Sequence, residues 1–468
     1  MVGARALSEK YRAYPEYKVS DVVWLEELPA LWKTSKLRYM FSFGKGLTIT
    51  KENLLDEGIP CVNYGEVHSK YGFEVDPAIH PLKCVSPDYL KSSPSALLSL
   101  GDLVFADTSE DIDGSGNFTQ LTSESILFAG YHTIIARPMD RKCSRFYAYL
   151  LDSLEIRTQI RHAVKGVKVF SITQAILRGV NVWVPTSNEQ QTITNFLDHE
   201  TAKIDTLIDK QQQLITLLKE KRQAVISHAV TKGVNPNAPM RDSGVEWLGE
   251  VPEHWSVGRY KFCTSRVVVG IAEAATHAYA DEGVPIIRST NIREEGLDTA
   301  GMLFIKQEFA EKNDSKYLYT NDVITVRTGY PGTSAVIPEA LDKSQCFTNL
   351  VATPKKSILP AFLSEYLNSH TGKSYFDLLG WGSAQKNISV PILQNVPIAW
   401  PDKHEQSEIM KYVESQRGRY TKLVGKAGEQ VILLRERRTA LISAAVTGKI
   451  DVRNWKVPVP NNSKEVAA

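Results

Sequence analysis

The stretch PTSNEQQTITNFLDHETAKIDTLIDKQQQLITLLKEKRQAVISHAVTKGVN, residues 185–235, has a second copy further along the chain. The second copy reads PDKHEQSEIMKYVESQRGRYTKLVGKAGEQVILLRERRTALISAAVTGKID and occupies residues 401–451, an offset of 216 without a gap (401 − 185 = 216). Arg222 matches Arg438 in this alignment. A repeat of this length has to be established first, because each copy occupies an equivalent place in the fold. The two copies therefore indicate a duplicated structural frame.

Both copies have the apolar pattern of one long helix. Apolar residues recur near steps of three and four, which is typical of a coiled-coil-like seam. Ser187 or Asn188 can cap the first helix, and Gly233 and Gly448 can end the two helices. We expect the helices to pack on each other in antiparallel fashion; the alternative is that each packs only on its own domain. The residues predicted for this seam, and for packing against partner chains, are Ile193, Leu197, Ile204, Leu207, Leu214, Leu218 and Val225 in the first copy and Ile409, Val413, Tyr420, Leu423, Leu434 and Leu441 in the second.

A second repeated phrase opens each half of the chain. Residues 24–32 read WLEELPALW and residues 247–255 read WLGEVPEHW, at an offset of 223 (247 − 24 = 223). We expect this phrase to anchor each globular part to the frame, with packed tryptophans and a proline that turns the chain, and not to contact a ligand. The predicted anchors are Trp24, Pro29, Trp32, Trp247, Pro252 and Trp255.

The two middles of about 130 residues hardly align with each other. Each alternates short β-branched and aromatic runs with turns and then continues into helical stretches, which predicts a mixed domain. The expected fold class is α+β: two mixed α/β domains separated by two long antiparallel coiled-coil helices, with a pseudo-twofold internal repeat. The predicted boundaries are 1–184 for the first domain, 185–232 for the central helix, 233–246 for a linker, 247–400 for the second domain, 401–449 for the distal helix and 450–468 for the tail.

Polar loops follow strands at comparable places in both middles. Recognition usually varies in loops on a common scaffold, and Arg, Asn, Gln and acidic side chains match the edges of DNA bases. The alternative for each loop is an ordinary solvated turn. The strands and the loops that they lead into are 59–60 with 63–64, 102–104 with 107–111, 284–285 with 288–291 and 322–324 with 327–330.

Length, net charge and cysteine spacing limit the classes of protein to which the chain can belong. A chain of 468 residues exceeds the usual limit of one core, about 250–300 residues. With 55 basic and 53 acidic residues, net +2, the charge neither indicates nor excludes nucleic acid. The five cysteines are scattered without a CxxC, which argues against disulfides and zinc. The sequence has no apolar run of about 18 residues and no secretory signal, so we expect a cytoplasmic protein.

The motifs of common catalysts are also missing. No GxGxxG follows a strand, and the sequence contains no complete P-loop, no HxxxH and no GxSxG. We therefore expect a binding protein without chemistry of its own, which holds no metal and no cofactor.

Three motifs resemble a known family. They are SGVEWLGEVPEHW at 243–255, the PxxxEQ start of each long helix, and its ending LISAAVTGKID. Together they resemble the specificity subunit of type I restriction–modification enzymes, and the resemblance covers essentially the whole chain. The first copy of the phrase is more diverged, with Asp21 and Glu26 in place of glycines. These changes affect a turn of the frame and leave the assignment unchanged.

The resemblance implies a non-catalytic subunit with two target-recognition domains, 1–184 and 247–400. Together they would recognise a bipartite, asymmetric double-stranded DNA site. The family pairs such a chain with two modification subunits, which carry S-adenosylmethionine and methylate adenine N6. Restriction subunits, with ATP and Mg, translocate and cleave DNA. The chain would scaffold both, and partners would supply much of the phosphate contact that dominates affinity.

By the family's pattern, a loop before each long helix also approaches DNA. These loops are 166–171 and 382–387. Combined with the polar loops above, they complete the set of candidate DNA-binding residues. The set is Lys45, Asn63, Tyr64, Lys70, Thr108, Ser109, Lys165 and Lys168 in the first half, and Arg288, Ser289, Asn291, Arg293, Arg327, Thr328, Tyr330, Gln385, Lys386 and Asn387 in the second.

Three alternatives stay open at this point. A stand-alone DNA-modifying enzyme would need the cofactor and catalytic motifs that are missing. A coiled-coil scaffold without DNA binding would have little reason to diversify only its middles. A specificity subunit of a fused or type II-like modification system would have the same sequence features as a type I subunit.

Overall fold

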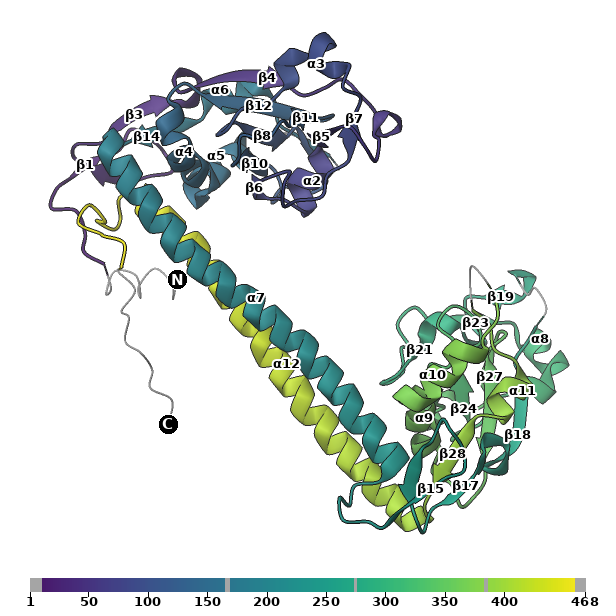
Figure 1. The fold of residues 1–468 in the computed structure, drawn as a ribbon. Coiled ribbons are helices and arrows are strands. Elements are labelled where there is room, and N and C mark those ends of the chain that lie inside the picture. The colour runs from purple at the N-terminus through teal and green to yellow at the C-terminus, as the bar shows by residue number, and fades with distance from the viewer. Residues whose placement is uncertain (1–10, 165–168, 273–275, 383–385, 459–468) are drawn as a thin grey trace. The chain divides into compact units, whose positions relative to one another are not determined.

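The computed structural model describes residues 11–164, 169–272, 276–382 and 386–458 (Figure 1). The chain divides into two compact units, Met1–Lys210 with Gln430–Ala468, and Gln211–Glu429. Each unit contains one mixed α/β domain and one end of both long helices. Because the division falls inside the helices, each unit is described by itself.

The two long helices are α7 (Ser187–Lys232) and α12 (Lys403–Val446). Each is followed by a glycine in the left-handed region, Gly233 with a φ of 80° and Gly448 with a φ of 74°. Such a glycine is a common helix stop, because it has no Cβ to strain that conformation. In the described part of the chain no helix, these two included, is long and apolar enough for a membrane span.

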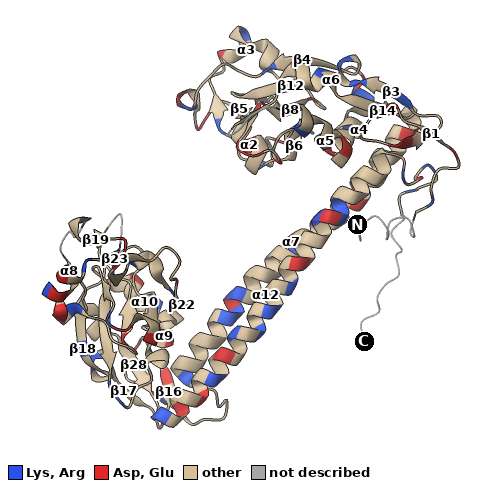
Figure 2. Cartoon of the chain, turned by 180° about the vertical axis from the view of Figure 1, so that it is seen from behind, with Lys and Arg blue, Asp and Glu red and all other residues tan. Residues whose placement is uncertain are grey.

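In each unit the two helices run antiparallel (Figures 1 and 2). In the first unit the start of α7 and the end of α12 meet at Trp32. Its indole N–H donates to Glu189 Oε1 at 3.1 Å, and its ring lies beside the glycine that ends α12. In the second unit Trp255 donates to Glu405 Oε1 at 3.1 Å and lies beside the glycine that ends α7. The helix ends are therefore exchanged: each domain holds the start of one long helix and the end of the other.

The seam between the helices differs in phase from the predicted one at three places. The predicted positions that are buried are Ile193, Leu197, Ile204, Ile409, Val413, Tyr420 and Leu441, and those that are half-buried are Leu218, Val225 and Leu434. Leu207, Leu214 and Leu423 are exposed, so placing them in the seam was wrong. Ile208, Ile215 and Val424 take these places, because steps of four and three alternate from Ile204 onward. An apolar residue stands at both i+3 and i+4 after Ile204, and periodicity alone does not choose between them.

The first domain combines two sheets. The larger has the strand order β4 (Phe41–Lys45), β12 (Thr133–Pro138), β8 (Leu103–Ala106), β10 (Phe118–Leu121) and β6 (Phe73–Val75), and the smaller β11 (Phe128–Ala129), β5 (Ile59–Val62) and β7 (Cys84–Val85). Both sheets contribute to one buried cluster that includes Val62, Val104 and Ile135. The helices of this domain are α2 (Tyr64–Ser69), α3 (Tyr89–Ser92), α4 (Ser144–Asp152), α5 (Leu154–Ala163) and α6 (Gln174–Gly179).

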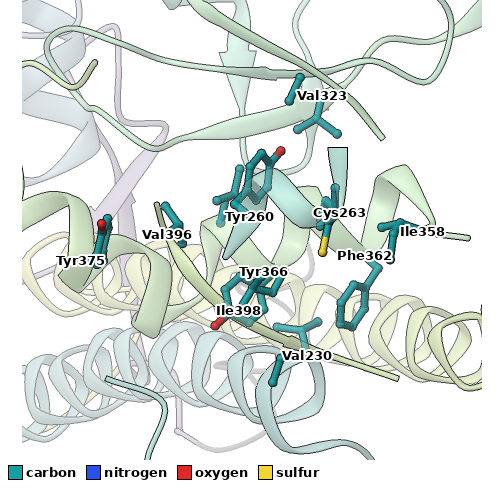
Figure 3. Packing of buried hydrophobic residues seen from close by; sticks show 14 of the residues in the cluster. Val230, Tyr260, Cys263, Val323, Ile358, Phe362, Tyr366, Tyr375, Val396 and Ile398 are labelled. Carbon is teal, nitrogen blue, oxygen red and sulfur yellow. The ribbon is translucent and has the colours of Figure 1, made fainter. Parts of the chain in front are cut away.

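The second domain has two four-stranded sheets. Their orders are β18 (Thr264–Val269), β27 (Leu350–Pro354), β24 (Val323–Thr325), β25 (Ser334–Val336), and β19 (Tyr279–Ala280), β23 (Leu303–Ile305), β20 (Val284–Ile287), β26 (Gln345–Cys346). Its helices are α8 (Gln307–Lys312), α9 (Pro360–Asn368), α10 (His370–Leu379) and α11 (Val390–Gln394). Figure 3 shows Val230 of α7 beside Ile398 and Tyr366 in the buried core, so the helix end is part of the domain's own packing.

Small sheets and frame contacts repeat between the halves. Ser443 Oγ accepts a hydrogen bond from Leu154 N at 2.9 Å, and Ser227 Oγ accepts one from His370 N at 3.0 Å. Both pairs are related by the same offset of 216. The repeated two-stranded sheets are β1 (Tyr17–Val19) with β2 (Glu27–Pro29), matched by β15 (Met240–Asp242) with β16 (Glu250–Pro252), and β3 (Lys33–Lys36) with β14 (Asn181–Val184), matched by β17 (Ser256–Arg259) with β28 (Pro397–Trp400). The internal repeat is thus present in the contacts as well as in the sequence.

The repeated tryptophan phrase is only partly a packed anchor. Its buried members are Pro29, Trp32, Pro252 and Trp255. Trp24 and Trp247 are 37% and 39% exposed, so the expectation that they are packed was wrong. Each contacts one aromatic ring of a domain helix and leaves the rest to solvent: Trp24 lies 4.4 Å from His162, and Trp247 meets Tyr375 edge-on at 6.2 Å between ring centroids. The spacing of the phrase is the same in both copies, but it does not show which tryptophan lies inside.

Candidate nucleic-acid interface

Two of the predicted loops meet in the second domain. The loop after β24 and the segment before α11 are joined by backbone hydrogen bonds, from Ile388 N to Arg327 O at 3.0 Å and from Gly329 N to Lys386 O at 3.3 Å. Thr328 and Asn387 form an isolated antiparallel bridge, and the Thr328 hydroxyl donates to the Asn387 carboxamide oxygen. Residues nearly 60 apart in sequence therefore form one polar surface.

The first domain builds the same junction. Strand β9 (Thr108–Ser109) pairs antiparallel with β13 (Phe170–Ser171), and Ile172 N donates to Asp107 O at 2.8 Å. Ile172 and Ile388 are equivalent in the repeat (388 − 172 = 216). Of the candidates at these junctions, Lys165, Lys168 and Gln385 lie outside the described residues.

Several candidates are buried and serve the domain itself. Asn63 begins α2, where its backbone N–H donates to Glu66 Oε2 at 3.1 Å. Asn291 accepts from Arg288 N at 3.0 Å, and Ser109 Oγ accepts from Asp111 N at 3.3 Å. Asn63, Asn291 and Ser109 are at most 5% exposed, so predicting them as direct base contacts was wrong. Short polar side chains are favoured at caps and tight turns for their local hydrogen bonds, and a loop start is where such caps occur.

The remaining candidates reach the surface. Tyr330 is 86% exposed at the tip of its loop. Two basic groups have a partner on the surface: Arg293 Nη2 lies 3.9 Å from Asp298 Oδ2 in an exposed pair, and Lys386 Nζ donates to Asp377 O at 2.8 Å. The exposed candidates are Lys45, Lys70, Arg293, Tyr330 and Lys386, and the half-buried ones are Tyr64, Thr108, Arg288, Ser289, Arg327, Thr328 and Asn387.

In the first domain the junction borders a hollow of about 470 Å³. Sequence reasoning missed three of its side chains, His68, Asn117 and His132. His132 Nδ1 lies 3.2 Å from Asp107 Oδ1, and its φ of 55° is in the left-handed region. Its counterpart by the offset of 216, Thr348, has a φ of 44°. A strained non-glycine residue at the same place in both domains is a feature of functional loops, and no sequence signal marks it, because one position is histidine and the other threonine. The hollow is lined by Tyr64, Gly65, His68, Ser69, Thr108, Ser109, Glu110, Asp111, Gly114, Asn117, His132 and Val169.

The repeated aspartates at the start of β8 and β24 have a structural role. Asp102 Oδ2 accepts from Ser99 N at 2.9 Å, and Asp322 Oδ2 accepts from Tyr319 N at 3.0 Å. Burial raises the pKa of both carboxyl groups, and hydrogen bonds and nearby arginines only partly offset this shift. These carboxyls close the turn that aims each strand at its loop.

Comparison with known proteins agrees with this architecture. The family model described as the type I restriction modification DNA specificity domain matches residues 29–217 and 272–419. This chain belongs to the specificity subunits of type I restriction–modification systems. The two matched regions overlap its two target-recognition domains and extend into the long helix that follows each of them. The predicted fold class and family are therefore confirmed.

The specificity subunits to which this chain is similar are distant from it in sequence and match it over most of its length. The EcoKI specificity subunit of Escherichia coli K12 is 21% identical over 401 residues, 83% of this chain and 82% of its own. The MjaVIII specificity subunit of Methanocaldococcus jannaschii is 23% identical over 316 residues, 65% of this chain and 71% of its own. A solved chain from work on complex assembly and conformational transition of a type I restriction–modification system has a TM-score of 0.59 at 16% identity, covering 90% of this chain and 99% of that one. It therefore shares the fold.

The cysteines of this specificity subunit have a structural role. All five cysteines are buried and free, and burial raises the pKa of Cys61, Cys263 and Cys346 to about 12, so these thiols stay protonated. In the described ranges no three His, Cys, Asp or Glu side chains gather in a way that would hold a metal ion.

Proposed function

We propose that the chain reads a bipartite, asymmetric DNA site, with one target-recognition domain on each half. The observation that carries this proposal is the repeated loop junction, Asp107 with Ile172 in one domain and Arg327 with Ile388 in the other. The same strands present the same two loops in both domains, yet the side chains on the loops differ. Such a pattern suits two readers of different sequences.

The recognition loops of the two domains carry side chains of opposite charge. The first loop carries Thr108 followed by Glu110 and Asp111, and carboxylates accept hydrogen bonds from cytosine N4. The second carries Arg327 and Tyr330, and arginine is the commonest partner of guanine O6 and N7. This contrast supports an asymmetric target.

Exposed leucines occur at equivalent positions of the two long helices, which supports a partner protein that binds in two copies. Leu207 matches Leu423 and Leu217 matches Leu433 at the offset of 216, and all four are exposed. Exposed leucines on a helix are characteristic of a protein interface when they recur in a pattern. We assign these pairs to two modification subunits, one on each unit.

Partner subunits would also supply positive charge, of which this chain has little excess. Figure 2 shows Lys and Arg mixed with Asp and Glu along both long helices, and the net charge is only +2. DNA affinity depends chiefly on phosphate contacts, so the partner subunits would provide many of them. S-adenosylmethionine would be bound by the modification subunits, and ATP and Mg by restriction subunits. This chain would remain the non-catalytic subunit that positions them.

Selection from random duplexes tests the proposal. The chain, assembled with its modification subunit, should enrich two short fixed sequences separated by an unspecified spacer. Arg327→Ala should relax one half only, by about 1–3 kcal/mol of discrimination, if Arg327 contacts a base edge. Arg419→Ala, on an exposed position of α12, is the matched control. Enrichment of one continuous motif, or of none, would contradict the proposal.

A further inference from the structure

In each unit, one arginine of a long helix forms an ion pair with a residue of the domain. Arg438 of α12 and Arg222 of α7 are equivalent (438 − 222 = 216). Arg438 forms ion pairs within the first unit and Arg222 within the second. Each leads towards a loop with candidate DNA-binding residues, but by a different route.

In the first unit Arg438 joins three helices. Its Nε lies 3.0 Å from Asp205 Oδ1 of α7, and its Nη1 lies 3.5 Å from Asp152 Oδ2 at the end of α4. The other oxygen of that carboxylate, Asp152 Oδ1, accepts from Arg157 Nη2 of α5 at 2.8 Å. Isolated exposed ion pairs contribute little, but here the guanidinium and the carboxylate are each shared by two partners in a half-buried network. The geometry of Arg157 therefore depends on Arg438.

From Arg157 the network continues to the recognition loop. Its Nη1 donates to Asn117 Oδ1 at 2.8 Å, and Asn117 Nδ2 lies 3.1 Å from His68 Nδ1. The other ring nitrogen, His68 Nε2, lies 2.6 Å from the carbonyl oxygen of Thr108. A carbonyl only accepts, so Nε2 carries the proton and Nδ1 accepts from the carboxamide. Because Arg157 donates to the carboxamide oxygen of Asn117, a flip of this amide would lose that hydrogen bond. Each polar group of the network is therefore either a donor or an acceptor.

In the second unit the route is shorter. Arg222 Nη2 lies 3.3 Å from Glu295 Oε1, and Lys373 of α10 pairs with Glu294. Both glutamates form the turn between β21 (Ile292–Arg293) and β22 (Gly296–Leu297). That hairpin directly follows the candidate loop 288–291. The helix pair thus contacts the hairpin beside a recognition loop in this domain as well, through one ion pair with an exposed glutamate.

We infer that Arg438 and Arg222 are positioning residues for sequence specificity, each fixing one recognition loop of its own unit relative to the helix pair. This inference rests on the proposed reading of DNA by these loops. Neither arginine contacts DNA in this account. A partner that binds the helices and shifts either arginine would then change the position of the loop, because Arg438 connects to Thr108 through successive polar contacts and Arg222 contacts the hairpin beside loop 288–291.

The test measures discrimination half-site by half-site in the assembled complex. Arg438→Gln should reduce the preference for the correct first half-site roughly 3- to 30-fold and leave the second unchanged, and Arg222→Gln should do the reverse. The matched controls are Arg437→Gln and Lys221→Gln, exposed neighbours at equivalent positions (437 − 221 = 216), which remove the same charge. Both controls should keep full discrimination at both half-sites.

Two further measurements separate the possible failures. Thermal unfolding of each variant reports whether the fold is intact. Asn117→Leu breaks the network far from the helices and should reproduce the Arg438→Gln effect, while the double variant should be no worse than either single one. If the parent complex discriminates and Arg438→Gln behaves like Arg437→Gln, the positioning role is wrong and the proposed function stands. If the parent complex does not discriminate at all, the proposed function itself fails.

Discussion

At the residue scale, polar side chains at loop starts have two possible uses that sequence alone does not separate. Asn63 and Arg327 both follow a strand, and both have side chains that could match a base edge. The structure buries Asn63 at the start of a helix and leaves Arg327 half-exposed at a loop junction. The difference depends on a hydrogen bond to a residue three positions on and on a segment 60 positions away. A local sequence pattern can indicate the hydrogen bond from Asn63 to Glu66, but it cannot indicate the distant segment that Arg327 contacts.

The buried carboxyl of Asp322 predicts an unusual pH dependence. Burial raises its folded-state pKa, so its contribution to stability is present below the unfolded pKa and is lost as pH rises through the folded pKa. Asp322→Asn does not titrate. Its free energy of unfolding, relative to the parent chain, should therefore increase from about pH 4 to pH 7, even if the loss of one acceptor lowers stability at every pH.

Denaturant unfolding at several pH values checks this slope. Asp342→Asn is the control, because hydrogen bonds from Thr320 lower the pKa of Asp342. Its contribution is present above the unfolded pKa and is lost as pH falls through the lower folded pKa, so the free energy of unfolding of Asp342→Asn relative to the parent chain should rise only below about pH 4 and stay flat from about pH 5 to pH 7. Equal slopes for the two variants would show that burial does not govern Asp322.

At the element scale, the long helices were predictable and their seam only partly so. Repetition at one offset and apolar residues at heptad spacing indicate α7 and α12 in the sequence. The phase of the seam after Ile204 needed the structure, because Leu207 and Ile208 are adjacent apolar residues and only one of them can face the partner helix.

The seam assignment predicts different effects for these neighbours. Ile208→Ala should lower the free energy of unfolding by about 2 kcal/mol, since it removes buried apolar volume from the helix contact. Leu207→Ala should change it by less than about 0.5 kcal/mol, since that side chain is exposed. Denaturant unfolding of the two full-length variants measures both. A larger effect at Leu207 would restore the seam that the sequence alone suggested.

The exposed leucine pairs predict partner stoichiometry. Leu217→Ser should remove the modification subunit from one unit and Leu433→Ser from the other, because a hydroxyl replaces the apolar contact in each case. Native mass spectrometry of the assembled complex should show one bound subunit for each single variant and none for the double variant. Ile79→Ser, an exposed apolar position in the first domain, serves as the control. Two bound subunits in every variant would show that partners dock elsewhere.

At the scale of the whole molecule, duplication makes the architecture readable from sequence while the contents of the domains are not. The matched pairs Trp32 with Trp255 and Glu189 with Glu405 repeat a single hydrogen bond in both halves. The route from Arg438 to Thr108 has no counterpart of that kind among the described residues of the second unit. It joins residues from five separate elements, and local pattern does not show which polar side chains such a network connects.

The helices also predict the spacing of the two half-sites. Inserting one heptad into both α7 and α12 keeps the phase of the seam and lengthens the pair by about 10 Å. If helix length sets the spacer, the recognised site should gain roughly three base pairs between unchanged half-sites. Selection from random duplexes with the lengthened chain would measure the spacer, and an unchanged spacer would contradict this role of the helices.

The most direct test of the central claim is a genome-wide map of adenine methylation in cells that express this chain with its modification subunit. We expect one asymmetric motif of two short fixed sequences with an unspecified spacer between them, methylated on both strands. A continuous palindrome, or methylation without sequence preference, would contradict it.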